Sequence, residues 1–112
     1  MITIYHNPAC SKSRATLELL QSRGIAPQVV HYIDTPPDES TLQTLLSVLG
    51  MNAMALARKG EPLAEALNIA AMDESTLITT MIKHPVLIER PIVVNGSRAV
   101  IGRPPERVLE IL

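Results

Sequence analysis

The chain of 112 residues contains a single cysteine, only two tyrosines, and neither tryptophan nor phenylalanine. One cysteine excludes an internal disulfide, and the absence of disulfides fits a reducing compartment. Cys10 is therefore either a buried, inert thiol or a reactive one. Because aromatic residues make up 2% of the chain, the core must be aliphatic. The same scarcity leaves no platform on which nucleic-acid bases could stack.

The sequence also has no large excess of positive or negative charge and no long apolar run. The formal net charge of −1 provides no basic field for nucleic acid, and no apolar run approaches the roughly 20 residues of a membrane helix. No basic leader precedes the first predicted strand, so we expect no signal peptide and a cytoplasmic protein. The three histidines and the cysteine lack metal-ligand spacing, so we expect no metal site.

Hydrophobic residues make up 46% of the sequence, enough for the core of one compact domain. Residues 2–5 predict a strand, about 12–23 a helix and 28–33 a second strand, which together form a βαβ unit with parallel strands. Asn95-Gly96 between β-branched runs predicts a hairpin over 91–101, followed by a helix from Pro104. That helix carries an apolar stripe, predicted to be Val108, Leu109, Ile111 and Leu112.

The stretch between these halves is helical in pattern. Leu42, Leu45, Leu46 and Leu49 follow helical spacing up to Gly50, and Asp73 can cap a helix that stops at His84-Pro85. The βαβ…ββα order is that of the thioredoxin fold. We therefore expect an α/β protein with a mixed four-stranded sheet, both hairpin strands antiparallel to the first, in a single domain over 1–112 with a helical insertion at about 38–84.

Cys10 follows the first strand and opens the first helix. Unpaired backbone N–H groups and the positive end of the helix dipole stabilise a thiolate there and can also hold an oxyanion. Ser13, three residues on, can turn its hydroxyl toward the sulfur, and His6 could either tune Cys10 or cap the loop. Arg14 could hold an anion or pair with Glu18. His31 and His84 are expected to be structural.

The spacing Cys10-x-x-Ser13 has a mechanistic consequence. A Cys-x-x-Cys pair can resolve its own disulfide, but a serine cannot. After oxidation of Cys10, or formation of an adduct on it, a thiol from outside the chain must complete the cycle.

Several motifs resemble those of the glutaredoxin-dependent arsenate reductase family, nearly end to end and in the same order. They are Tyr-His-Asn-Pro-Ala-Cys (5–10), Ser13-Arg14, Thr35-Pro36-Pro37, Ala57-Arg58-Lys59, His84-Pro85, Glu-Arg-Pro-Ile-Val-Val (89–94) and Gly102-Arg103-Pro104. The resemblance implies that Cys10 attacks arsenate, that Arg58, Arg90 and Arg103 bind the oxyanion, and that Pro91 follows a cis peptide bond. It further implies reduction of arsenate to arsenite with glutathione as co-substrate and glutaredoxin as partner, without a tightly bound cofactor.

Alternatives stay open at this point. The substrate could be another oxyanion or a glutathione mixed disulfide, because typical family members carry a further C-terminal segment beyond the position of Leu112. Relatives that regulate transcription bind RNA polymerase instead, so a non-catalytic regulator that binds a protein partner is the second reading. Those relatives often use a Cys-x-x-Cys switch, which this sequence lacks. The three arginines could also be ordinary solvated surface residues.

Overall fold

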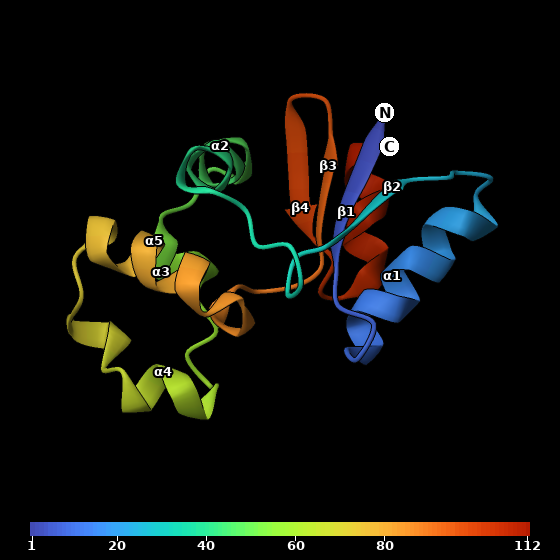
Figure 1. The fold of residues 1–112 in the computed structure, drawn as a ribbon. Coiled ribbons are helices and arrows are strands. Elements are labelled where there is room, and N and C mark those ends of the chain that lie inside the picture. The colour runs from blue at the N-terminus through green and yellow to red at the C-terminus, as the bar shows by residue number, and fades with distance from the viewer. The chain divides into compact units, whose positions relative to one another are not determined.

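The computed structural model describes all residues, 1–112, and the chain forms two compact units (Figure 1). The first unit comprises residues 1–35 and 90–112, and the second comprises residues 36–89. The second unit contains the whole segment, about 38–84, that the sequence indicates as a helical insertion. That the units act as a single domain stays a prediction.

The first unit is built on a four-stranded mixed sheet with the strand order β2-β1-β3-β4. β1 (Ile2–His6) runs parallel to β2 (Gln28–His31) and antiparallel to β3 (Ile92–Asn95), which pairs with β4 (Arg98–Ile101). The predicted mixed four-stranded sheet is confirmed. The prediction that both hairpin strands oppose β1 was wrong for β4, because the two strands of a hairpin run in opposite directions and β4 therefore follows the direction of β1.

An aliphatic core lies between this sheet and two helices, α1 (Ser11–Ser22) and the 3₁₀ helix η3 (Pro105–Ile111), which also contact one another. Its buried members are Ile4, Leu20, Val93, Val100, Val108 and Ile111. Only Val108 and Ile111 of the predicted C-terminal stripe are buried, whereas Leu109 and Leu112 are exposed. The reason is that a 3₁₀ helix repeats every three residues, so its inner face carries positions three apart.

Local backbone geometry determines where β2 ends and where the hairpin of β3 and β4 turns. β2 ends at His31 and not at residue 33, because the amides of Asp34 and Thr35 both donate to the His31 carbonyl, at 3.1 and 2.9 Å, and close a turn. The hairpin turns at Gly96, whose φ of +62° lies in the left-handed region that glycine adopts at no steric cost.

The second unit is helical, with α2 (Glu39–Leu49), α3 (Ala53–Leu56), α4 (Pro62–Ala66), η1 (Ile69–Ala71), α5 (Glu74–Lys83) and η2 (Pro85–Leu87). α5 contacts α2, α3 and η2. The predicted cap at Asp73 is confirmed, because its side chain accepts from the Thr76 amide at 2.8 Å. Asp38 caps α2 in the same way and accepts from the Thr41 amide at 2.7 Å. No helix combines the length and the apolar character that crossing a bilayer would require.

Candidate active site

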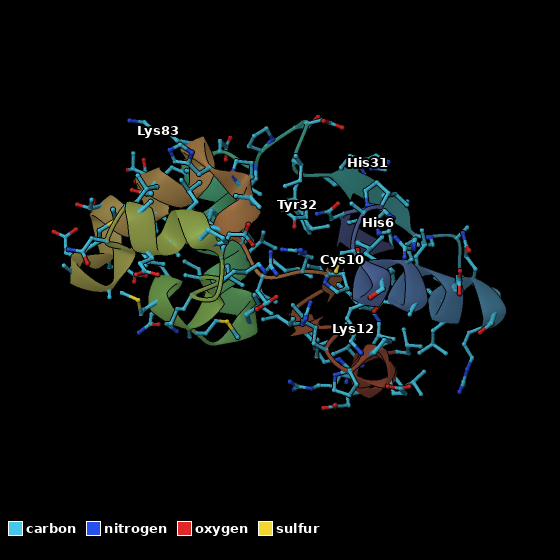
Figure 2. All side chains as sticks on the ribbon, turned by 90° about the horizontal axis from the view of Figure 1, so that it is seen from below. His6, Cys10, Lys12, His31, Tyr32 and Lys83 are labelled. Atoms are coloured by element: carbon cyan, nitrogen blue, oxygen red, sulfur yellow. The ribbon has the colours of Figure 1, made fainter.

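Cys10 occupies the N-cap position of α1, with an extended backbone (φ −98°, ψ 123°) and no side-chain capping bond (Figure 2). The first three amides of α1, those of Ser11, Lys12 and Ser13, have no backbone acceptor. These orphan N–H groups and the positive end of the helix dipole make this position favourable for a thiolate or an oxyanion. Cys10 is partly exposed, so a reactant from solvent can approach it.

The loop that carries Cys10 is held by local hydrogen bonds. Asn7 accepts the Cys10 amide on its backbone carbonyl and the Ala9 amide on Oδ1, both at 3.0 Å. Nη1 of Arg14 donates to the Pro8 carbonyl at 2.8 Å. Of the two roles weighed for Arg14, the pairing with Glu18 does not occur, and the guanidinium fixes the loop.

His6 and Ser13 form a buried pair behind this loop. His6 Nδ1 and Ser13 Oγ are 2.6 Å apart, and Ser13 Oγ also accepts the Asn7 amide at 3.0 Å. The sequence predicts a Ser13 hydroxyl that faces the sulfur, but here the hydroxyl bonds to His6 and to the loop backbone. Burial first, and then the positive charges of His31 and Arg14, lower the pKa of His6 below its ordinary value of 6.5.

Arg103 reaches Cys10 from the far end of the sequence. Its Nη1 atom lies 3.9 Å from Cys10 Sγ, a long contact within reach of a sulfur acceptor, and 3.3 Å from the Arg90 carbonyl. The Arg90–Pro91 bond is cis, as the resemblance implies, and Arg103–Pro104 is cis as well. Arg90 and Arg103 thus meet on the same side of the first unit as the Cys10 loop.

Gly102 makes the approach of Arg103 possible. Its amide donates to the Pro91 carbonyl at 2.9 Å, and its own carbonyl accepts from Thr16 Oγ1 at 3.3 Å. A Cβ atom at this position would meet Thr16 Oγ1 at 2.6 Å and Pro91 Cγ at 3.0 Å. Only glycine therefore lets the segment before Arg103 lie this close to α1.

Arg58 belongs to the second unit, where acidic side chains surround it. Its Nη1 atom lies 2.8 Å from Glu61 and its Nε atom 3.6 Å from Glu89. The backbone is fixed by a bond of 2.7 Å from the Arg58 amide to the Leu87 carbonyl. These carboxylates were not predicted from the sequence, although the spacing of three residues between Arg58 and Glu61 is one at which opposite charges often pair.

The structure therefore brings together Cys10, His6, Ser13, Arg14 and Arg103, with the carbonyl of Arg90, in the first unit. His31 contacts His6 in this group, and Thr16 bonds to Gly102, the residue before Arg103; neither was predicted as a site residue. No group of three or more His, Cys, Asp or Glu side chains is arranged to hold a metal ion. A pocket of about 280 Å³ in the second unit contains none of the predicted site residues and is lined by Lys59, Ala64, Glu65, Asn68, Ile69 and Ala70.

This arrangement has a defined chemical capacity. A thiol at a helix N-terminus, with a guanidinium within reach of its sulfur, can act as a nucleophile toward an anion held by the same donors. A planar guanidinium donates through a fork that fits the oxygens of a tetrahedral oxyanion.

Comparison with known proteins shows which family the chain resembles. Residues 5–111 match the ArsC family. The chain is 54% identical to an uncharacterized protein, YfgD, of Escherichia coli strain K12, over 99% of this chain and 96% of that one. It is 45% identical to an arsenate reductase of the same strain, over 99% of this chain and 80% of that enzyme.

The fold agrees equally well. The structure of an arsenate reductase from Vibrio cholerae is 50% identical and superposes with a TM-score of 0.96, over 99% of this chain and 97% of that one. The predicted thioredoxin-like fold is confirmed by this likeness. Since the family match and the similarity to these relatives extend over nearly the whole sequence, the chain belongs to the ArsC family.

Proposed function

We propose that this protein is an arsenate reductase that converts arsenate to arsenite through Cys10, with glutathione and glutaredoxin as the sources of electrons. The observation that carries the proposal is the contact of 3.9 Å between Arg103 Nη1 and Cys10 Sγ at the N-terminus of α1. It puts a nucleophile and a permanent cation side by side. Relatives that are 45% identical over nearly the whole chain bear the name arsenate reductase.

In the proposed first step the Cys10 thiolate attacks arsenic(V). A sulfur–arsenic bond forms, one arsenic–oxygen bond breaks, and the protonated oxygen leaves as water. Arg58, Arg90 and Arg103 hold the remaining oxygens and stabilise the negative charge that develops on them. The orphan amides of α1 add neutral donors at the same thiol.

The electrons come from outside the chain, because Cys10 is the only cysteine and Ser13 cannot form a disulfide with it. A glutathione thiol displaces a second oxygen, which also leaves as water, so arsenic carries two sulfurs. A glutaredoxin thiolate then attacks the glutathione sulfur. The sulfur–arsenic electron pair passes to arsenic, which becomes arsenic(III), and water releases arsenite from Cys10.

The test is arsenate-dependent NADPH consumption, coupled through glutathione, glutathione reductase and glutaredoxin. We expect turnover with the wild type, none with Cys10→Ser and strongly weakened turnover with Arg90→Ala, while circular dichroism shows that each variant is folded. Omitting glutaredoxin should stop the reaction. A folded protein with a reactive Cys10 and no turnover of arsenate would overturn the proposal and direct the search to another oxyanion or to a glutathione mixed disulfide.

A further inference from the structure

His6 and His31 are direct neighbours in the sheet. They are paired in register at the ends of the parallel strands β1 and β2, so their side chains leave the same face of the sheet. The ring centroids are 5.9 Å apart with an interplanar angle of 63°, an edge-to-face contact (Figure 2). His6 is 5% exposed, whereas His31 lies at the surface. The ring of His31 therefore forms part of the wall that encloses His6.

The hydrogen bonds of Ser13 favour one tautomer of the His6 ring. Ser13 Oγ accepts the Asn7 amide, and the only other polar atom bonded to it is His6 Nδ1, at 2.6 Å. A buried hydroxyl proton needs an acceptor, and Nδ1 is the one available. A neutral imidazole that accepts on Nδ1 and carries its proton on Nε2 satisfies this need.

We propose that His31 is a positioning residue for the Cys10 site, whose ring holds the His6 imidazole in the orientation and neutral tautomer that accept the Ser13 hydroxyl. The proposal rests on the proposed function in that Cys10 is the reacting group. It assigns a positioning role to His31, a residue on β2 that does not contact the Cys10 sulfur.

The path from His31 to Cys10 consists of successive contacts. His31 packs on His6, His6 accepts from Ser13, and Ser13 accepts the Asn7 amide. The Asn7 carbonyl in turn accepts the Cys10 amide at 3.0 Å. A His6 ring that turned over or gained a proton on Nδ1 would take the acceptor from Ser13 and loosen the loop that presents the thiol.

The charges around His6 favour the same state. The charged groups that face it are His31 from β2 and Arg14 from α1, and both oppose a second positive charge on the His6 ring. The effect of the ring contact can be separated from the effect of the charge, because a phenylalanine at position 31 keeps an aromatic ring beside His6 but carries no charge.

The experiment is nitrogen-15 NMR of the histidine rings, which distinguishes the two tautomers, together with the rate of Cys10 alkylation by iodoacetamide between pH 5 and 9. The variants are His31→Phe, which keeps a ring without a charge, and His31→Ala and His31→Gln, which remove the ring. His84→Gln, in the second unit, is the matched control. Neither readout uses arsenate, so failure of the arsenate assay and failure of this proposal are distinguishable.

We expect wild type, His31→Phe and His84→Gln to share the Nε2–H tautomer of His6 and one alkylation profile. In His31→Ala and His31→Gln, we expect mixed tautomers and an alkylation midpoint raised by about half a pH unit or more, as the thiolate loses ordered loop donors. Unchanged spectra and profiles in both ring-deleted variants would overturn the proposal. So would a His31→Phe protein that behaves like His31→Ala.

Discussion

Nη1 of Arg103 lies 3.9 Å from Sγ of Cys10, although 93 positions separate the two residues in the sequence. Two structural causes produce the contact. The sheet brings the end of β4 beside the start of α1, and Gly102 lets the backbone approach Thr16. A guanidinium in this position stabilises a thiolate before the reaction and oxyanion charge during it.

Replacement of Arg103 should therefore impair catalysis far more than replacement of another surface arginine. We expect Arg103→Ala to lower kcat for arsenate by about 100-fold, the usual effect of removing one donor to developing negative charge. Arg103→Lys should fall between Arg103→Ala and the wild type, because lysine keeps the charge but lacks the fork. The measurement is the coupled NADPH assay at saturating arsenate.

Arg107 provides the matched control for that experiment. It follows closely in sequence, is largely exposed and pairs with Glu110 at 3.3 Å. Arg107→Ala should turn over arsenate at the wild-type rate. Equal losses in Arg103→Ala and Arg107→Ala would indicate a general effect of charge and contradict a specific role of Arg103.

The close approach at Gly102 makes a prediction about stability. The Cβ of Gly102→Ala would lie 2.6 Å from Thr16 Oγ1 and 3.0 Å from Thr16 Cγ2, so α1 or the 102–104 segment must shift. We expect a loss of about 1–3 kcal/mol in the free energy of unfolding, the usual cost of overpacking. Urea denaturation followed by circular dichroism measures this loss.

Two further variants test the cause. Thr16→Ala removes two of the three atoms that the new Cβ would meet and leaves only Pro91 Cγ, at 3.0 Å, so the double variant should lose less than the sum of the single losses. Gly60→Ala has nothing within 4 Å of the added carbon and should change stability by no more than about 0.5 kcal/mol. Additive losses in the double variant would show that the contact with Thr16 is not the cause.

The parts of the fold that were predictable from the sequence have local causes. Asp38 and Asp73 satisfy amides three residues away, and Gly50 and Gly96 take positive φ angles, so these boundaries are encoded where they occur. The position of Cys10 at the start of α1 was predictable for the same reason. The family resemblance added the expectation that Arg103 serves the same site.

What was not predictable depends on contacts distant in sequence or on competition between partners. Ser13 turns to His6 because the strand places a buried acceptor 2.6 Å from it. Arg14 prefers the Pro8 carbonyl to Glu18 because the loop folds back over the first turn of α1. The role of His31 depends on strand register, and the register is set by the whole sheet.

The capping carboxylates predict how acid affects the second unit. Hydrogen bonds from the backbone and then the side chain of Thr41 hold the pKa of Asp38 below its ordinary value of 3.8. Those from the side chain and then the backbone of Thr76 do the same for the pKa of Asp73. A folded-state pKa below the unfolded one stabilises the folded state at every pH above the unfolded value. This stabilisation is lost as the pH falls through the folded-state pKa.

Asparagine tests this prediction, since it keeps the capping acceptor but cannot titrate. We expect the Asp38→Asn/Asp73→Asn protein to be less stable than the wild type at neutral pH, with the difference shrinking as the pH falls below about 4. Melting temperatures from pH 7 to pH 2.5 measure the difference. A difference that is constant over this range would mean that the carboxylate charges contribute nothing to folding.

The last prediction concerns the acidic partners of Arg58. Glu61 at 2.8 Å and Glu89 at 3.6 Å neutralise the cation that we propose binds arsenate. An oxyanion that binds Arg58 must compete with these carboxylates. Removing one of them should favour the oxyanion, so we expect Glu61→Gln to lower KM for arsenate by about two- to fivefold, the range set by a partly exposed ion pair.

The same variant distinguishes competition from support. If Glu61 mainly oriented the Arg58 fork, Glu61→Gln would raise KM for arsenate and weaken inhibition by inorganic phosphate. If Glu61 competes, KM falls and phosphate inhibits more strongly, because phosphate presents the same tetrahedral oxygens to the arginine. Glu65→Gln, an exposed carboxylate on the neighbouring helix α4, should change neither constant. A lower KM in both variants would indicate only an effect of net charge. Competition between Glu61 and the oxyanion for Arg58 requires that KM fall in Glu61→Gln alone.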